Sequence, residues 1–347
     1  MKTSEKMPEK TPIATLGAFG LIDRLAKTVE LKQPSTLKGI GDDAAVVRYK
    51  KAATVVSAEL FLEGIHFDLT YTPLKHLGYK LVTAGVSDIY AMNATPRQIL
   101  LSIGLDKRFC VEEVEELYAG VKIACEHYGV DLAGGDTTTS LTGLTLHITV
   151  TGEAPEENIV YRSGGKQADL LCLTGDLGAA YMGLQLLERE KRVFDGNPRK
   201  QPQLEGYNYI LQRHLKPEAR KDIIELLAQH HILPTSMIDV SDGLASDALH
   251  LCKQSNCGVR IYLERLPIAS ETFRLADEIH IDAVTAALHG GDDYELLFTV
   301  PVALYDTIRK ELPSVDIIGH LCPPSEGACL LTPDNQAIAL TAQGWVG

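Results

Sequence analysis

The chain has 347 residues, of which 45% are hydrophobic and 23% are charged, and its formal net charge is -13. This length and composition are typical of a globular protein with two domains, whose cores need neither disulfides nor a structural metal. The net negative charge, without a stripe of Lys and Arg, argues against nucleic acid or an anionic membrane as a partner.

The cysteines and the N-terminal segment indicate the cellular compartment in which the protein is found. Seven cysteines are scattered along the chain without a CxxC pair, which favours a reducing compartment over a disulfide framework or a zinc ribbon. The segment MKTSEKMPEKTP lacks the apolar stretch of a signal peptide, and no apolar run approaches the length that spans a membrane. We therefore expect a cytoplasmic protein.

Apolar spacing predicts a mixture of helices and strands after a polar tail over 1–15. In the first half, helices are predicted over 16–29, 74–94 and 111–128, and strands over 53–61 and 142–154. In the second half, strands are predicted over 168–174, 258–263 and 294–300, and helices near 217–230 and 245–255. This mixture favours layered α+β, or mixed α/β, domains over a strictly parallel βαβ sheet.

Two stretches rich in Pro, Gly and charge divide the chain. The stretch 155–168 is predicted to separate an N-terminal domain over 1–155 from a C-terminal domain over 156–347. The stretch 189–207 is predicted to be a loop, and a lid that closes over substrate is one interpretation of it. Such a lid would make its protease sensitivity depend on bound substrates.

Five short stretches combine aspartate with small residues: GIGDDAA (39–45), VSD (86–88), AGGD (133–136), DVSDG (239–243) and GGDD (290–293). Gly and Asp are common in turns, so any one stretch could be a simple turn. Because five of them adjoin apolar stretches, we predict loops whose carboxylates converge. Converging carboxylates repel one another unless a cation lies between them, and Mg²⁺ that shares its shell with a polyphosphate prefers such oxygen ligands.

Other motifs for nucleotides and catalysis are absent from the sequence. There is no G-x-x-x-x-G-K-[ST] loop, no G-x-S-x-G elbow and no D-x-[DN]-x-[DN]-G calcium loop. The match Gly39-x-Gly41-x-x-Ala44 to the dinucleotide fingerprint carries two charges, on Asp42 and Asp43, that would repel a pyrophosphate. These features argue against a P-loop protein, a serine hydrolase, a calcium buffer and a Rossmann dehydrogenase.

In their order, the aspartate stretches resemble those of the thiamine-monophosphate kinase family, within the aminoimidazole-ribonucleotide synthase-like superfamily. The resemblance runs from about residue 16 to the C-terminus and rests on GIGDDAAVV (39–47), EGIHF (63–67), VSDIYAMNATP (86–96), AGGDTT (133–138), YRSGG (161–165), IDVSDGLASD (238–247) and GGDDYELLFT (290–299). It implies two α/β domains and a homodimer formed through the N-terminal one. It also implies that ATP phosphorylates thiamine monophosphate to thiamine diphosphate.

The resemblance further implies roles for individual residues. Mg²⁺ would be bound at Asp43, Ser57, Ala58, Glu59, Asp88, Asp136, Asp239 and Asp242. ATP would contact Gly135, Asp136, Arg162 and Ser241, and thiamine monophosphate would contact His66, Asp292 and Trp345. No side chain is expected to act as a covalent catalyst, because the acceptor phosphate is already a nucleophile and bound Mg²⁺ can align it for direct in-line transfer.

The chain departs from the family pattern at several positions. Ala58-Glu59 stands where Thr-Asp is usual, Asp292 stands where Glu is usual, and Gly85 replaces a usual Asn. The usual aromatic-Asp-His-Phe ending is shortened, and the chain ends soon after Trp345. The longer side chain of Glu59 would require the metal or the backbone to move.

Two alternatives stay open. One is another ATP-using member of the superfamily, such as aminoimidazole-ribonucleotide synthase, selenophosphate synthetase or a hydrogenase-maturation factor. Selenophosphate synthetase should carry a reactive Cys or selenocysteine near the N-terminus, whereas the first cysteine here is Cys110. The other alternative is a catalytically weakened nucleotide-binding regulatory protein, which Ala58 and Glu59 favour. Measuring ADP release with thiamine monophosphate and Mg²⁺ separates an enzyme from such a regulator.

Overall fold

The computed structural model describes residues 11, 15, 24–25, 27–38, 46–47, 53–197 and 201–342. The described residues form two compact units that the chain visits alternately. Unit 1 takes its residues from Met1–Lys50, Ala58–Val82 and Arg97–Thr151, and unit 2 takes its residues from Lys51–Ser57, Thr83–Pro96 and Gly152–Gly347. Two short segments of the N-terminal half therefore belong to the unit that holds the C-terminal half.

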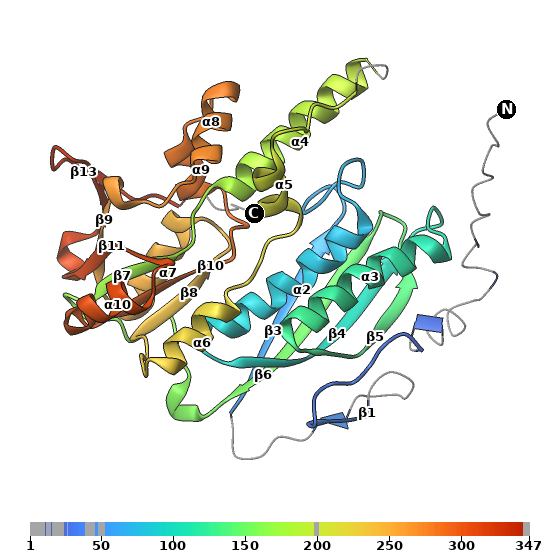
Figure 1. The fold of residues 1–347 in the computed structure, drawn as a ribbon, viewed down its shortest axis with the longest axis horizontal. Coiled ribbons are helices and arrows are strands. Elements are labelled where there is room, and N and C mark those ends of the chain that lie inside the picture. Colours follow the sequence, from blue (N-terminus) through green and yellow to red (C-terminus); the bar gives the residue numbers. More distant parts are fainter. Residues whose placement is uncertain are drawn as a thin grey trace. The chain divides into compact units, whose positions relative to one another are not determined.

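A four-stranded sheet with the order β3-β6-β4-β5 provides most of the strands of unit 1. Its strands are β3 (Ala53–Leu62), β4 (Thr95–Leu105), β5 (Asp131–Thr139) and β6 (Thr145–Ala154). Helices α2 (Leu74–Ala91) and α3 (Val111–Tyr128) lie over one face of this sheet (Figure 1). Strand β4 buries Ile99 and Leu101, and α3 buries Val114 and Leu117, so two apolar faces pack together. A separate antiparallel pair is formed by β1 (Thr36–Lys38) and β2 (Val46–Val47).

Unit 2 contains a seven-stranded sheet with the order β13-β12-β9-β11-β7-β10-β8. Its strands are β7 (Leu170–Thr174), β8 (Ser236–Val240), β9 (Gly258–Tyr262), β10 (Glu295–Val300), β11 (Val315–Cys322), β12 (Ala328–Leu331) and β13 (Ala337–Ala339). Neighbouring strands are antiparallel, except that β12 and β9 are parallel. The mixed sheet confirms the predicted fold class.

Helices cover both faces of the central strands of unit 2. They are α4 (Ala179–Gly196), α5 (Asn208–Leu215), α6 (Lys221–Gln229), α7 (Leu244–Ser255), α8 (Ser270–Ile279), α9 (Ala283–His289) and α10 (Tyr305–Glu311), with 3-10 turns η2 (Glu156–Asn158), η3 (Leu263–Arg265), η4 (Val302–Leu304) and η5 (Pro324–Glu326). Strand β7 shows the two faces, because Leu171 packs in one hydrophobic cluster with α7 and Cys172 packs in another with α6. Strands β7, β8 and β10 are buried along their whole length, as expected for a sheet covered on both sides.

Most of the elements predicted from apolar spacing are confirmed, but three local predictions are wrong. The loop predicted over 189–207 is wrong at its start, because α4 continues to Gly196. The stretches 86–88 and 133–136 are not loops: the first lies near the C-terminal end of α2 and the second lies inside β5. The helix predicted over 16–29 falls largely outside the described residues.

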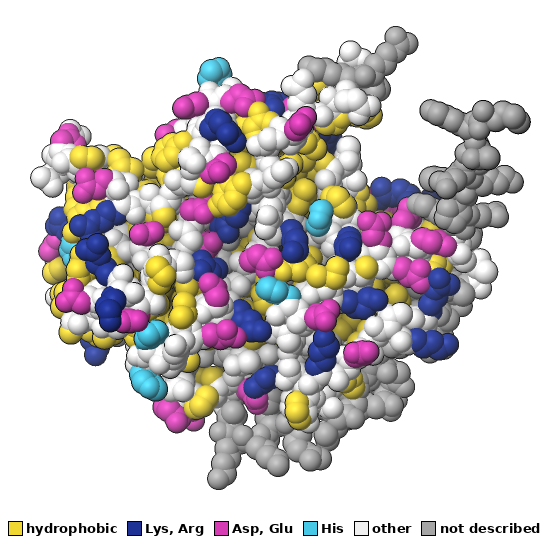
Figure 2. All heavy atoms as spheres, in the orientation of Figure 1, with side chains coloured by type: hydrophobic (Ala, Val, Ile, Leu, Met, Phe, Trp, Pro, Cys, Tyr) yellow, Lys and Arg dark blue, Asp and Glu magenta, His cyan; other side chains and the backbone are white. Residues whose placement is uncertain are grey.

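All seven cysteines lie in described segments, and none of them forms a disulfide. Among the helices that the structure describes, none is both long and apolar enough to cross a membrane. Acidic and basic side chains are interspersed over the face that Figure 2 shows.

Candidate active site

A cavity of about 220 Å³ in unit 2 brings together four of the residues predicted from the sequence. It is lined by Val55, Val56, Ser57, Asp88, Ala91, Met92, Arg162, Met237, Ile238 and Asp239. The polar members come from four separate segments: Ser57 from β3, Asp88 from α2, Asp239 from β8 and Arg162 from the chain before β7. The cavity is therefore a meeting point of segments that lie far apart in the sequence.

Two serine hydroxyls hold the two carboxylates of this cavity. Ser57 donates a hydrogen bond from Oγ to Oδ2 of Asp88. Ser87 donates a hydrogen bond from Oγ to Oδ2 of Asp239, over 2.7 Å. Because Ser87 and Asp88 are consecutive in α2, one turn of this helix contacts both β3 and β8 within unit 2. The helix thereby fixes where the two carboxylates lie.

The carboxylate of Asp239 is in an unusual electrostatic environment. Its side chain is buried, and burial raises the pKa of the Asp239 carboxyl to about 7, with the negative charge of Asp88 acting in the same direction. The hydrogen bond from Ser87 and the positive charge of Arg162 lower this pKa and offset part of the effect. Two acidic groups that face one cavity in this way are costly to ionise together unless a cation compensates their charge.

A further buried carboxylate, Asp247, was missed in the sequence-based assignment of roles. It lies in the first turn of α7, and burial raises the pKa of its carboxyl to about 8, with the negative charges of Asp239 and Asp242 acting in the same direction. Its Oδ2 atom is buried without a hydrogen-bond partner among the described residues. The only signal in the sequence was its place at the end of IDVSDGLASD, next to the predicted metal ligands.

The donor set of the cavity fits Mg²⁺ that is shared with phosphate. Mg²⁺ commonly takes one or two carboxylates from a protein and fills the rest of its shell with water and phosphate oxygens. Asp88 and Asp239 offer two carboxylates, and Ser57 offers a hydroxyl. Among the residues that the structure describes, no group of three or more His, Cys, Asp and Glu side chains is arranged as a complete metal site. The observed donors would therefore leave most of the shell to ligands from outside the protein.

The residues predicted to contact nucleotide and acceptor lie side by side at the ends of β8 and β10. The backbone N–H of Asp292 donates to the carbonyl oxygen of Ser241 over 2.8 Å, and that of Tyr294 donates to Val240 over 2.9 Å. Gly291 has φ 72°, and a Cβ at this position would lie 2.5 Å from the Ser241 oxygen. The close approach of the two loops therefore requires glycine. Asp242, the next residue of the β8 loop, is exposed.

The predicted metal ligands of unit 1 are spread over its sheet. Ala58 and Glu59 lie on β3, whereas Asp136 lies on β5, and these are the two outer strands of the four-stranded sheet. The sheet thus does not bring Glu59 and Asp136 together. Glu59 is half-buried, and Asp136 is exposed.

Two more predicted contacts lie in unit 1. A Cβ at Gly135 would lie 1.7 Å from the carbonyl oxygen of Leu101, so the packing of β4 against β5 requires glycine there independently of any ligand. His66 is exposed, its Nδ1 accepts a hydrogen bond from the Leu62 N–H over 3.1 Å, and its ring stacks on Phe61. Predicted residues Asp43 and Trp345 lie outside the described residues.

Comparison with known proteins places the chain in a family. Residues 41–154 match the family described as AIR synthase related protein, N-terminal domain. The thiamine-monophosphate kinase of Aquifex aeolicus (strain VF5) is 35% identical over 287 residues, which are 82% of this chain and 86% of the relative. The thiamine-monophosphate kinase of Escherichia coli (strain K12) is 32% identical over 339 residues, which are 95% of this chain and 97% of the relative.

Solved structures agree with the sequence comparison. Thiamine-monophosphate kinase from Stenotrophomonas maltophilia K279a has a TM-score of 0.77 at 29% identity and covers 92% of this chain and 96% of its own. AaThiL complexed with AMPPCP and TMP has a TM-score of 0.73 at 31% identity and covers 99% of each chain. The hydrogenase maturation protein HypE of E. coli shares only the fold, at 16% identity and a TM-score of 0.73. The chain belongs to the thiamine-monophosphate kinase family.

Proposed function

We propose that the chain transfers the γ-phosphoryl group of ATP to thiamine monophosphate and releases thiamine diphosphate and ADP. Relatives with this activity in their names match most of the chain at 35% and 32% identity, and a similar structure holds AMPPCP and TMP. In the structure itself, the proposal is supported by the cavity of unit 2, where Asp88 and Asp239 face one space together with Ser57 and Arg162.

The chemistry requires two anions to be brought together. The acceptor is a phosphate monoester whose second pKa is about 6, so it is a nucleophile near neutral pH and needs no general base. Its oxygen forms a bond to the γ-phosphorus while the bond from that phosphorus to the oxygen bridging it to the β-phosphate breaks, and the electron pair leaves with ADP. We propose direct transfer in line, without a phosphoenzyme. Isolation of a phosphorylated Asp or His that is chemically competent would contradict this step.

The residues of the cavity can compensate the negative charges of the two anions that this reaction brings together. Asp88 and Asp239, with Ser57, would hold Mg²⁺, and Arg162 would direct its planar guanidinium at the polyphosphate. When bound, Mg²⁺ would supply charge neutralisation at the phosphate oxygens. The hydroxyls of Ser57 and Ser87 keep the carboxylates in place before any ligand arrives.

The other assigned residues stay predictions. Asp43, Ala58, Glu59, Asp136 and Asp242 are predicted at metal sites, Gly135 and Ser241 at ATP, and His66, Asp292 and Trp345 at thiamine monophosphate. Replacing Trp345 with Ala should weaken the hold on the thiamine substrate and leave ATP affinity little altered. A selective loss of ATP affinity would contradict that placement.

We also propose a homodimer, formed through the face of the four-stranded sheet that the helices leave open. Leu60 and Leu100 are 47% and 37% exposed, on β3 and β4. Because side chains alternate along a strand, Leu100 points away from its buried neighbours Ile99 and Leu101. Apolar residues on such a face favour pairing with a second copy. Light scattering of the wild type and of Leu100→Lys tests this, and a monomeric wild type would contradict it.

We further propose a cytoplasmic location and a domain division near 155.

A coupled assay of ADP release across candidate acceptors tests the function. Thiamine monophosphate should support turnover with one thiamine diphosphate formed for each ADP, and thiamine itself should not replace it. Nucleotide binding without turnover on any acceptor would instead favour a regulatory protein. ADP release that does not depend on thiamine monophosphate would favour another enzyme of the superfamily.

A further inference from the structure

The loop Gly290–Tyr294, which leads into β10, adopts an uncommon backbone conformation. Gly291, Asp292 and Tyr294 have φ of 72°, 59° and 53°. Two of these are not glycine, and side chains other than glycine adopt such angles only where the surroundings enforce them. Contacts with other segments must therefore keep the loop that carries Asp292 in this conformation.

One side of this loop is held by the end of β8, through the two backbone hydrogen bonds from Asp292 to Ser241 and from Tyr294 to Val240. The other side is held by side chains. Asp293 lies between Asp292 and Tyr294, both of which have positive φ, and is fully buried. Its Oδ2 accepts a hydrogen bond from the backbone N–H of Gly178 over 3.0 Å.

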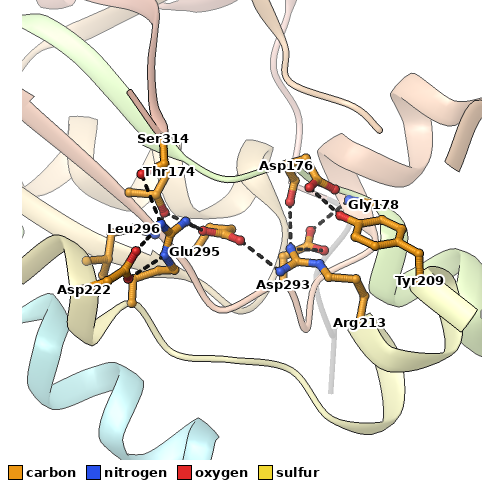
Figure 3. Close-up of polar contacts among 11 residues, drawn as sticks. Thr174, Asp176, Gly178, Tyr209, Arg213, Asp222, Asp293, Glu295, Leu296 and Ser314 are labelled. Atoms are coloured by element: carbon orange, nitrogen blue, oxygen red, sulfur yellow. Dashed lines mark hydrogen bonds and ion pairs between the residues drawn. The ribbon is translucent and has the colours of Figure 1, made fainter. Parts of the chain in front are cut away.

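Two arginines contact Asp293 and Glu295, the acidic residues on either side of Tyr294 in the sequence, and Figure 3 shows Arg213 beside both of them. Arg213 donates from Nη1 to Oε1 of Glu295 over 2.9 Å, and its Nη2 lies 3.7 Å from Oδ1 of Asp293. Arg220 donates from Nη1 to Oε2 of Glu295 over 2.7 Å. Arg213 thus links both acidic side chains at the start of β10, and it reaches them from α5, another part of unit 2.

The cluster formed by Arg213, Arg220, Asp293 and Glu295 is not arranged for maximal stability. The Nε atom of Arg213 and the Oδ1 atom of Asp293 are buried without a hydrogen-bond partner among the described residues. Burial raises the pKa of the Asp293 carboxyl to about 7, which Arg213 only partly offsets. Buried ion pairs often add little to stability, since desolvation offsets their attraction, and incompletely paired ones add less. These buried charges are better explained by a role in fixing the geometry of the loop Gly290–Tyr294.

We propose that Arg213, acting through Asp293 and Glu295, is a positioning residue that holds Asp292 in the orientation in which it binds the thiamine substrate. The inference rests on the proposed function, because it assigns Asp292 to the acceptor. Arg213 has no predicted contact with ATP, so its effect should be confined to the acceptor side of the reaction.

The test compares Arg213→Lys with the wild type in the full chain. Lysine keeps the positive charge but loses the fork that reaches both acidic side chains. The KM for thiamine monophosphate should rise about tenfold, which is within the loss of up to about 100-fold that a misplacement of about 1 Å can cause. The KM for ATP should change less than about twofold. Asp293→Asn, which keeps an acceptor for Gly178, should show the same selectivity and serves if Arg213→Lys folds poorly.

Asp222→Asn is the matched control. Asp222 accepts hydrogen bonds from Arg220 over 2.9 and 2.8 Å, but its side chain is 59% exposed. Removing its charge should leave both KM values unchanged.

A double-mutant cycle separates positioning from a general structural role. If Arg213 acts through Asp292, then Arg213→Lys should add nothing to the KM effect of Asp292→Ala. Additive effects, or equal effects on both KM values, would overturn the inference while the proposed function stands. A wild type that does not phosphorylate thiamine monophosphate would overturn the proposed function, and the inference with it.

Discussion

The backbone N–H of Asp292 donates a hydrogen bond of 2.8 Å to the carbonyl oxygen of Ser241. This bond lies beside the antiparallel pairing of β10 with β8, in which Leu296 lies opposite Asp239. Residues predicted to contact acceptor, nucleotide and metal are thus tied to one backbone ladder inside unit 2. A reaction that joins two phosphate groups needs its binding residues at fixed distances, and adjacent strands provide this without help from mobile side chains.

Gly291 offers a direct test of this ladder. In Gly291→Ala, the new Cβ would lie 2.5 Å from the Ser241 oxygen, at a φ of 72°. Because both loops must move, we expect KM for ATP and for thiamine monophosphate to rise together, and the free energy of unfolding to fall by about 1–3 kcal/mol. Steady-state kinetics and urea denaturation measure the two effects.

Gly327→Ala is the control for this substitution. Gly327 has φ 67°, but a Cβ there would meet nothing within 4 Å. It should cost about 1 kcal/mol of stability through backbone strain alone and leave both KM values as they are. Wild-type kinetics for Gly291→Ala would show that the contact with Ser241 does not matter.

Asp88→Asn should abolish turnover while the fold survives. The change removes one of the two carboxylates of the cavity but keeps an oxygen that can accept from Ser57. Losing a charged metal ligand should lower the rate about 100-fold or more. Stability without Mg²⁺ should be equal or slightly higher, because the charge that raises the pKa of Asp239 is gone.

The measurement combines Mg²⁺-dependent ADP formation with thermal melting in EDTA. Asp277→Asn, which changes an exposed carboxylate on α8, is the control and should leave both unaffected. Unchanged turnover in Asp88→Asn would remove Asp88 from the metal site.

Elements with strong local patterns could be predicted from the sequence, and elements shaped by distant contacts could not. Helix α3 spans Val111–Tyr128, as its apolar spacing predicts. Strand β5 was missed because AGGD resembles a turn, whereas Gly135 is there to let the Leu101 carbonyl approach. The cluster of Arg213, Arg220, Asp293 and Glu295 could not be predicted either. Arg213 and Glu295 are 82 positions apart, and no spacing rule connects them. Of the carboxylates that the aspartate stretches predict to converge, Asp88 and Asp239 line one cavity of unit 2, whereas Asp136 lies on β5.

Ser87→Ala should change the pH dependence of the reaction. The hydrogen bond from Ser87 lowers the pKa of the Asp239 carboxyl, so its removal should raise this pKa further. The protonated carboxyl binds a cation poorly, and the acid limb of kcat/KM for MgATP should therefore move to higher pH, by up to about 1 unit.

Ser236→Ala is the matched control for Ser87→Ala. Ser236 is a buried serine in the same strand as Asp239, and its hydroxyl pairs with Thr299 over 2.7 Å. Removing the Ser236 hydroxyl should not shift the acid limb of kcat/KM for MgATP. A shift of the limb to lower pH in Ser87→Ala would contradict the assignment of Asp239.

Asp247→Asn should stabilise the chain, and more so at high pH. The pKa of this carboxyl is raised to about 8 in the folded chain, compared with about 4 when it is exposed in the unfolded chain. Between these values the folded chain keeps a proton that the unfolded chain loses, so this carboxyl lowers the free energy of unfolding as pH rises. Asparagine does not titrate, and its advantage should be absent near pH 4 and largest at pH 8. One pKa unit corresponds to about 1.4 kcal/mol, and we expect a gain of at least about 1 kcal/mol at pH 8 relative to pH 5.

Urea denaturation in EDTA at pH 5, 6.5 and 8 measures the difference between Asp247→Asn and the wild type. EDTA is needed because a bound cation would favour the ionised carboxylates and hide the effect. Asp277→Asn, an exposed carboxylate, should show no trend with pH. A difference that is the same at all three pH values would mean that Asp247 ionises normally, and that the charges of Asp239 and Asp242 do not reach it. A growing advantage would instead show that Asp247 resists ionisation without a cation, because its carboxyl is buried and the negative charges of Asp239 and Asp242 act on it.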